Sequence, residues 1–195
     1  LKPVRGRRRL TGERETSDFL FEADSQAAAL TELIEFYRRD EEGLLVRWRE
    51  LAAAHGNPVF IGMGTSRIAP LLVADVFGGE GGIDAGEFVH YRLDDPDRGA
   101  LYVLVSQSGE SVETRRAAET LADAGCPTAA IVNDTGSTMA RRAGLALPML
   151  AGEEKSISNK TYLNTLALLH LLAGGSFGPL EEAAAALAEP VDRDS

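Results

Sequence analysis

The sequence has little cysteine and no long apolar stretch. Its 195 residues include one cysteine, Cys126, and no run of 18 apolar residues. A single cysteine excludes an internal disulfide and suits a reducing compartment, so we expect a cytoplasmic protein. Because a transmembrane helix needs a longer apolar run than any present, we expect no membrane partner.

Basic residues are also scarce. The 20 Lys and Arg residues stand against 30 Asp and Glu residues, which gives a formal net charge of −10. A negative protein repels nucleic-acid phosphates, so we expect no nucleic-acid partner. We expect the basic run Arg5, Arg7, Arg8 and Arg9 to be a solvated tail, with a nucleic-acid arm as the alternative. A small phosphorylated ligand is not excluded, because the field of exposed charges fades over about 8 Å and the local loop decides.

The rest of the composition is that of a folded domain. Hydrophobic residues make up 44% of the sequence and charged residues 26%, and the length suits one well-buried domain with terminal extensions. We predict an irregular segment over 1–23, a folded domain over 24–175 and a linker-like tail over 176–195. The tail contains a short helical pattern at 180–187.

The spacing of apolar residues predicts an α/β fold. Helical spacing over 27–37 and 44–52 predicts a helical N-terminal extension. Short apolar runs and helical patterns then alternate; the expected strands are 59–61, 83–88, 101–105, 129–132 and 145–150, and the expected helices are 68–77, 112–124, 137–143 and 160–173. Short turns join these elements, which favours a three-layer sandwich with a five-stranded parallel sheet covered on both faces.

Two loops at strand ends carry glycines and hydroxyl groups, at 62–66 and at 106–111. Ligands of open parallel sheets bind beyond the carboxyl ends of the strands, where helix N-termini point their free amides. In the second loop, three serine hydroxyls can donate to phosphate oxygens, and Gly109 permits a nest of amides. We therefore predict a phosphate site there. The alternative is that Ser106 and Ser108 are only helix caps and turn formers.

Other common ligand motifs are missing. A dinucleotide fingerprint would require a glycine at position 67, where the sequence has Arg67. We find no Walker motif, no serine elbow and no zinc spacing, and His55, His90 and His170 lack metal-ligand spacing. We therefore expect no cofactor and no metal.

The string Val103–Ser111 resembles the hallmark loop of the sugar isomerase (SIS) domain family, and is closest to the first isomerase half of glucosamine-6-phosphate synthase. Further segments agree with that family in order and spacing; they are 61–66, 86–88 with Tyr91, 131–133 with 136–137, and 154–157 with 160–162. The segment 22–26 also resembles the acidic stretch that precedes the family's domain. The resemblance covers about residues 17–173 and implies a SIS, flavodoxin-like fold.

The resemblance also implies a ligand and a set of contacts. It implies that the chain binds a sugar phosphate. It assigns the phosphate to Ser106, Gln107, Ser108 and Ser111, sugar hydroxyl contacts to Thr65 and Ser66, and closure over the sugar to Ile157, Ser158 and Asn159.

The reaction implied is aldose–ketose isomerisation, or a related deamination or deglycation of an aminosugar phosphate. Isomerisation needs a base that moves a proton between adjacent carbons and an acid that helps to open the ring. Our catalytic candidates are Glu110, Lys160 and Glu154, with Glu87 and His90 as further options. Because no glutaminase domain is present, we do not expect glutamine-dependent amination. The alternative function is a module that senses a sugar phosphate without turning it over.

The closing helix at 160–173 is apolar around most of its circumference. One face can meet the sheet, and a second face then needs cover. We expect a homodimer or pairing with a second SIS domain, as the resemblance also implies. The alternative is that the two N-terminal helices cover this face within the chain.

Overall fold

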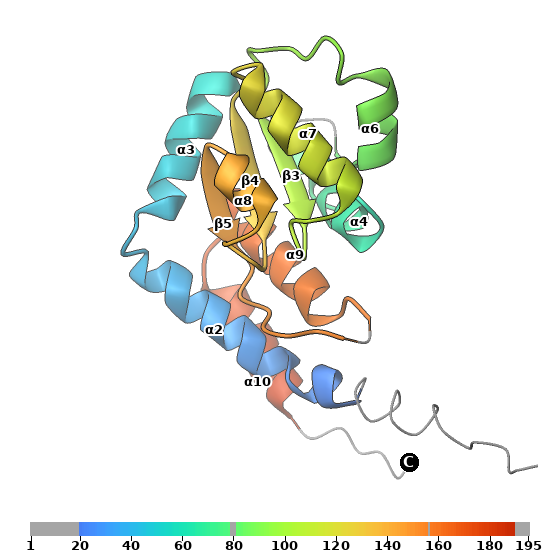
Figure 1. Cartoon of the computed structure of the whole chain (residues 1–195). Helices are drawn as coiled ribbons and strands as arrows, with labels where there is room; N and C mark the ends of the chain where they lie inside the picture. Colours follow the sequence, from blue (N-terminus) through green and yellow to red (C-terminus); the bar gives the residue numbers. More distant parts are fainter. Residues whose placement is uncertain (1–19, 79–80, 156, 190–195) are drawn as a thin grey trace, which may run out of the picture.

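The computed structural model describes residues 20–78, 81–155 and 157–189, and its centre is a five-stranded parallel sheet (Figure 1). The strand order is β2-β1-β3-β4-β5, and every neighbouring pair is parallel. The strands are β1 Val59–Gly62, β2 Ile83–Asp84, β3 Tyr102–Ser106, β4 Thr128–Val132 and β5 Leu145–Pro148. This order is that of the flavodoxin-like doubly wound fold, so the predicted fold class is confirmed.

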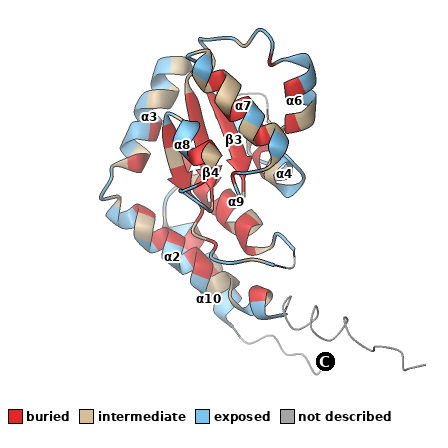
Figure 2. Cartoon of the chain, viewed as in Figure 1, coloured by how far each residue is buried: buried red, intermediate tan, exposed pale blue. Residues whose placement is uncertain are grey.

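The strands are apolar on both faces because helices cover both. All residues of β3 and β4 are buried. Val103 and Val105 belong to one apolar cluster, while Tyr102 and Leu104 belong to another on the opposite face. Figure 2 shows the buried strands between helices whose outer faces are exposed. The chain is therefore a three-layer sandwich with two cores.

Two sets of helices form the outer layers. Against the first core pack α2 Gln26–Arg39, α3 Leu44–His55, α4 Thr65–Leu71, α5 Ala74–Phe77, α9 Lys160–Leu172 and α10 Gly178–Ala188. Against the second pack α6 Ala85–Tyr91, α7 Val112–Asp123 and α8 Thr138–Arg142. The two predicted N-terminal helices are thus confirmed as α2 and α3.

Two predicted elements were wrong in their extent. The expected strand over 83–88 ends at Asp84, whose carboxylate accepts hydrogen bonds from the amides of Gly86 and Glu87 and so caps α6. The expected helix over 68–77 begins earlier, at Thr65, and is divided into α4 and α5.

The ends of the chain differ in part from expectation. Residues 20–24 are helical rather than irregular, and residues 1–19, with their arginines, lie outside the described residues. The helical pattern at 180–187 is present as α10, which packs along α2. The division into domains stays a prediction.

The second face of α9 is covered inside the chain. Helix α9 packs on α2, α3 and α4, and Leu168 and Leu172 are buried. Buried hydrogen bonds fix the covering helices, because the Tyr37 hydroxyl donates to the Pro148 carbonyl at 2.9 Å and the Trp48 indole to the Leu172 carbonyl at 2.8 Å. The expectation that this face needs a second domain was therefore wrong.

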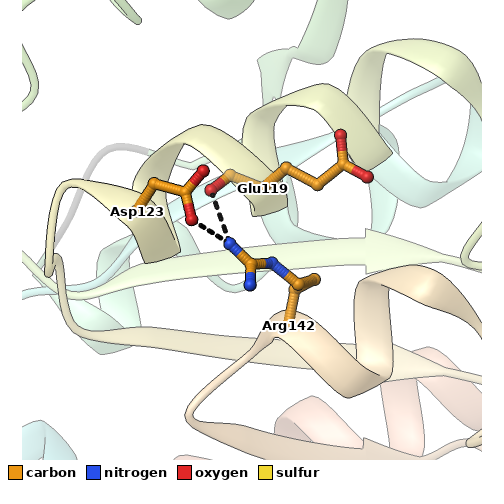
Figure 3. A network of polar contacts seen from close by, with 3 residues as sticks. All are labelled: Glu119, Asp123 and Arg142. Atoms are coloured by element: carbon orange, nitrogen blue, oxygen red, sulfur yellow. Dashed lines mark hydrogen bonds and ion pairs between the residues drawn. The ribbon is translucent and has the colours of Figure 1, made fainter.

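An ion pair joins the C-terminal ends of α7 and α8. The Arg142 guanidinium, in the last turn of α8, contacts the carbonyl of Glu119 and the carboxylate of Asp123 on α7 (Figure 3). Arg142 and Asp123 are exposed, so this ion pair contributes little to stability.

Among the residues that the structure describes, no helix is long and apolar enough to cross a membrane.

Candidate functional site

The loops that carry the predicted site residues follow the strands at one edge of the sheet. In a parallel sheet the carboxyl ends of all strands face the same way. β1 and β3 are neighbours although β2 lies between them in sequence, so the chain reverses its winding direction between them. This topological switch point is where ligands of such sheets bind. The loops at 62–66 and 106–111 flank it.

The loop after β3 carries serine hydroxyls that accept hydrogen bonds from its own backbone amides. The Ser106 hydroxyl oxygen accepts from the amide of Gly109 at 3.1 Å, and that of Ser108 from the amide of Glu110 at 3.2 Å. Because the Ser108 oxygen acts as an acceptor, its O–H remains available to an anion. The Ser106 hydroxyl also lies 3.4 Å from the Ser111 hydroxyl, so its O–H has a partner within the loop. The Ser111 hydroxyl contacts that of Thr114, whose own proton is donated to the Ser111 carbonyl.

Gly109 fits this loop tightly against the start of α8. Its φ is +63°, and a Cβ there would lie 2.1 Å from the hydroxyl oxygen of Ser137. Its carbonyl accepts from the amide of Met139 at 3.2 Å. The Ser137 hydroxyl is itself buried and caps α8 by accepting from the amide of Ala140. Only glycine fits both the backbone angle and the space.

The N-terminus of α7 opens directly after this loop. Ser111 is its N-cap residue, yet the Ser111 side chain does not cap the helix, whereas Asp84 caps α6 and Ser137 caps α8. The amides of the first turn of α7 are therefore left for another acceptor, at the positive end of the helix dipole. The turn-former alternative concerned Ser106 and Ser108, and both do accept from amides within the loop.

Glu110 points toward α8. Its carboxylate accepts from the Thr138 amide at 2.5 Å. This hydrogen bond is the main cause that holds the pKa of the Glu110 carboxyl below its usual value of 4.5, and Arg115 and Arg141 lower the pKa further. Glu110 is exposed and is charged near neutral pH, so chemically it can act as a base.

Thr65 and Ser66 begin α4, next to the start of α9. Gly62 allows the close turn before them, because a Cβ there would lie 2.6 Å from the Ser66 carbonyl oxygen. The two hydroxyl residues line a small hollow together with Thr161 and Tyr162. Met149 and Thr165 complete its lining.

Glu154 and Lys160 are both bonded to the backbone at the start of α9. One carboxylate oxygen of Glu154 accepts from the amides of Asn159 and Lys160 at 2.8 and 2.7 Å, and the other from the Thr161 hydroxyl. Lys160 is buried, and its ammonium donates to the Glu153 carbonyl at 2.7 Å. Both side chains therefore stabilise this helix start.

Of the residues expected to close over the sugar, two are open to solvent. Ile157 and Ser158 are exposed, whereas Asn159 is half-buried and its side chain accepts from the Lys160 amide. The role of each in ligand binding stays a prediction.

Asn133 connects the phosphate loop to the loop after β5, a role that sequence reasoning missed. Its amide donates to the Gln107 carbonyl at 3.1 Å. Its side chain accepts from the Ala151 amide at 2.8 Å and donates to the Gly152 carbonyl at 2.7 Å. The available signal was a lone amide side chain directly after a buried strand.

Glu22 was missed in the same way. It lies far from this edge in sequence, yet its carboxylate accepts from the Lys155 amide at 2.5 Å. The signal was an acidic residue within an apolar stretch, Phe19 to Ala23.

The described residues hold no group of three or more His, Cys, Asp or Glu side chains that could bind a metal ion.

Comparison with known proteins identifies the domain type. Residues 80–174 match the family model of the SIS domain. A glutamine–fructose-6-phosphate aminotransferase (isomerizing) from Methanosarcina acetivorans is 38% identical over 115 residues, which are 56% of this chain and 19% of that protein. The chain thus spans about a fifth of the length of the curated relatives it matches.

Two solved structures share the fold. The C-terminal domain of glucosamine-fructose-6-phosphate aminotransferase from Francisella tularensis superimposes with a TM-score of 0.65 at 19% identity, covering 87% of this chain and 52% of that one. The Vibrio vulnificus NanR protein complexed with ManNAc-6P gives a TM-score of 0.63 at 17% identity, covering 90% and 67%.

Proposed function

We propose that the chain, whose residues 80–174 match the SIS domain family model, binds a sugar phosphate, with the phosphate on the loop Ser106–Ser111. The observation that carries this proposal is the arrangement of the loop. The exposed hydroxyl of Ser108 keeps a proton to donate, and the first-turn amides of α7 are not capped by Ser111. Each hydrogen bond to a charged group contributes about 1.5–3 kcal/mol, so several together hold a phosphate dianion.

Local charge favours this site despite the negative net charge. Arg115 and Arg141 lie close enough to Glu110 to lower its pKa, so they also raise the potential at the adjacent loop. The remaining acidic residues are screened by solvent beyond about 8 Å. Arg115 and Arg141 thus offset the negative charges of Glu110 and Glu113 at this loop, so a phosphate site is compatible with an acidic protein.

We propose further that the chain is a phosphosugar aldose–ketose isomerase, or a related aminosugar-phosphate deaminase or deglycase. Of the three catalytic candidates, Glu110 is the most exposed and lies inside the phosphate loop. It is ionised near neutral pH, as a base that removes a proton beside a carbonyl must be. Glu154 and Lys160 instead support the start of α9, where they orient the backbone next to the sugar.

A module that senses a sugar phosphate without turning it over is the alternative. It is favoured by the engagement of Glu154 and Lys160 with the backbone, which leaves them poorly placed for proton transfer. The structure of a protein with this fold, NanR, contains the sugar phosphate ManNAc-6P, which is a precedent for sugar-phosphate binding by the fold.

Calorimetry with fructose 6-phosphate and with fructose tests the binding proposal. We expect heat of binding with the phosphorylated sugar alone, and equal affinity for both sugars would rule out the phosphate loop. A coupled assay with fructose 6-phosphate and glucosamine 6-phosphate then separates the two functions. Turnover that Glu110→Gln abolishes, with binding retained, supports the isomerase; tight binding without turnover in the wild type supports the sensing module.

We also propose that two copies of this chain pair through the face of α4 and α5, beside Thr65 and Ser66. This face carries exposed apolar side chains, namely Ile68 and Leu71 on α4, Leu72 at the C-cap of α4 and Val76 on α5. Large exposed apolar patches usually mark interfaces. Each copy has a net charge of −10, but the exposed charged residues of α4 and α5 are one of each sign, Arg67 and Asp75, so this face adds little to the repulsion between two copies.

Light scattering at micromolar concentration tests the pairing. Leu72 and Val76 are 65% and 67% exposed, so Leu72→Glu and Val76→Glu are expected to give folded monomers. Val46→Glu, at an exposed apolar position on α3, is the matched control and should still pair. A monomeric wild type at every concentration, or variants that pair as the wild type does, would contradict the proposal.

A further inference from the structure

Glu22 is a buried carboxylate in the helical residues ahead of α2. It is 4% exposed, and glutamate is rarely so buried unless it is paired. Its carboxylate accepts from the backbone amide of Lys155 at 2.5 Å, across 133 residues of sequence. A hydrogen bond from an amide to a carboxylate is stronger than one between neutral groups. Glu22 also lies outside the 80–174 match to the family model.

The partner of Glu22 lies in the loop between β5 and α9. Side chains bind the backbone of this loop at several places, one of which is the Glu153 carbonyl that accepts from the Lys160 ammonium. Asn133 binds its beginning at Ala151 and Gly152, Glu22 binds Lys155, and Glu154 binds its end at Asn159 and Lys160. Glu22 is the support that comes from ahead of the α/β sandwich.

The segment that carries Glu22 is itself anchored on the core. The Ser25 hydroxyl donates to the Glu22 carbonyl at 3.0 Å, which ends the short helical stretch. The Ala29 carbonyl accepts from the fully buried side-chain amide of Asn164, on α9, at 3.0 Å. Helix α2 also packs on α9 and α10. Glu22 therefore projects from an anchored segment, and its hydrogen bond can hold the Lys155 backbone in place.

The phosphate loop has supports of its own. Gly109 packs against Ser137, and Glu110 binds the Thr138 amide, so α8 holds this loop. Loss of the Glu22 contact would thus alter one side of the site and leave the other in place.

We infer that Glu22 is a positioning residue for sugar recognition, which fixes the Lys155 backbone and thereby sets Ile157, Ser158 and Asn159 against the sugar. The inference rests on the proposed function. It makes the segment ahead of α2 part of the sugar side of the site, while the phosphate side is built without it.

Calorimetry with two probes tests this inference, with fructose 6-phosphate reporting on the whole site and inorganic phosphate on the phosphate loop. Glu22→Ala is expected to weaken fructose 6-phosphate binding by about tenfold and to leave inorganic phosphate binding unchanged. Glu22→Gln keeps an oxygen that accepts from the Lys155 amide, so it should restore most of the affinity. Glu32→Ala, at an exposed glutamate on α2, is the matched control and should bind both probes as the wild type does.

The outcomes separate the inference from the proposed function. A wild type that binds neither probe defeats the proposed function. A wild type that binds both, with a Glu22→Ala variant that loses both equally or loses neither, overturns the positioning role alone. Should Glu22→Ala not fold, Glu22→Asp withdraws the carboxylate by one methylene, and it must show the same selective loss for the inference to stand.

Discussion

Replacement of Gly109 by alanine tests whether the phosphate loop is packed as described. The substitution adds a Cβ at a φ of +63° and places it 2.1 Å from the Ser137 hydroxyl oxygen and 2.6 Å from the Ser137 Cβ. The left-handed backbone angle costs about 1–2 kcal/mol for a residue with a Cβ. The collision adds about 1–3 kcal/mol for overpacking, because Ser137 is buried and cannot swing away freely. Displacement of the Ser137 cap from α8 adds about 1 kcal/mol.

The chain offers a control that isolates the backbone cost. Gly125, after α7, has a φ of +75°, and a Cβ there would meet nothing within 4 Å. Gly125→Ala should therefore lower the free energy of unfolding by about 1–2 kcal/mol, from the left-handed angle alone. Gly109→Ala should lower it by about 3–6 kcal/mol, a large share of the stability of a typical domain. Urea unfolding of both variants measures the difference.

A second substitution should rescue the first. Ser137→Gly removes both atoms that collide with the new Cβ, and glycine at an N-cap costs only a few tenths of a kcal/mol. The double variant Gly109→Ala with Ser137→Gly should then fall close to Gly125→Ala in stability, with a coupling of about 2–4 kcal/mol from the relieved collision and cap loss. Equal losses for Gly109→Ala and Gly125→Ala, or no rescue by Ser137→Gly, would refute the packing of this loop on α8.

Three further predictions concern single side chains. Ser108→Ala should weaken phosphosugar binding about tenfold with an unchanged melting temperature. Ser108 is exposed, and its hydroxyl accepts only from the Glu110 amide in this loop. Calorimetry and thermal unfolding check this prediction, and a large fall in melting temperature with unchanged affinity would contradict it. The folded state lowers the pKa of Glu110, so the stabilisation from its hydrogen bond to Thr138 is present above the unfolded pKa and is lost as pH falls through the folded pKa. Urea midpoints from pH 6 to pH 3 should therefore fall more for the wild type than for Glu110→Gln. Parallel curves for the two proteins would count against this hydrogen bond. Burial raises the pKa of Tyr37, so stability should fall as pH rises above about 10, where the unfolded phenol ionises first. Tyr37→Phe should lessen that fall without abolishing it, because burial raises the pKa of Tyr102 as well. By leaving the Pro148 carbonyl unpaired it should also cost about 1–2 kcal/mol at neutral pH, and an unchanged alkaline slope in its urea midpoints would contradict the prediction.

The sheet was predictable because its signals are local. β3 and β4 are short continuous apolar runs bounded by polar loops, and such runs predict strands buried on both faces. The loop at 106–111 was found for the same reason, since its hydroxyls and Gly109 are adjacent in sequence. The predicted strand at β2 was too long, because the two residues of β2 are too few to show the alternation of side chains that marks a strand. The signal that ends it, Asp84 followed by Glu87 as in a capping box, was read as part of a strand.

What could not be predicted depends on contacts between distant segments. Periodicity shows that α9 is apolar on several faces, but it does not say that α2 and α3 cover them. Likewise, a glutamate and a lysine do not reveal that Glu22 will accept from the backbone of Lys155. The candidate roles of Glu154 and Lys160 came from residue type, whereas the structure adds their bonds to the start of α9.

The separation of Glu22 from Lys155 has a consequence for the order in which the site assembles. Glu110 and Thr138, which hold the phosphate loop, are 28 residues apart, whereas Glu22 and Lys155 are 133 apart. Loop-closure entropy grows with separation, by about 0.6 kcal/mol for each doubling, and non-local contacts form late. During synthesis, moreover, Lys155 leaves the ribosome after Ser137 and Thr138, which hold the phosphate loop. The folding chain should therefore acquire affinity for phosphate before it can recognise the sugar that carries it.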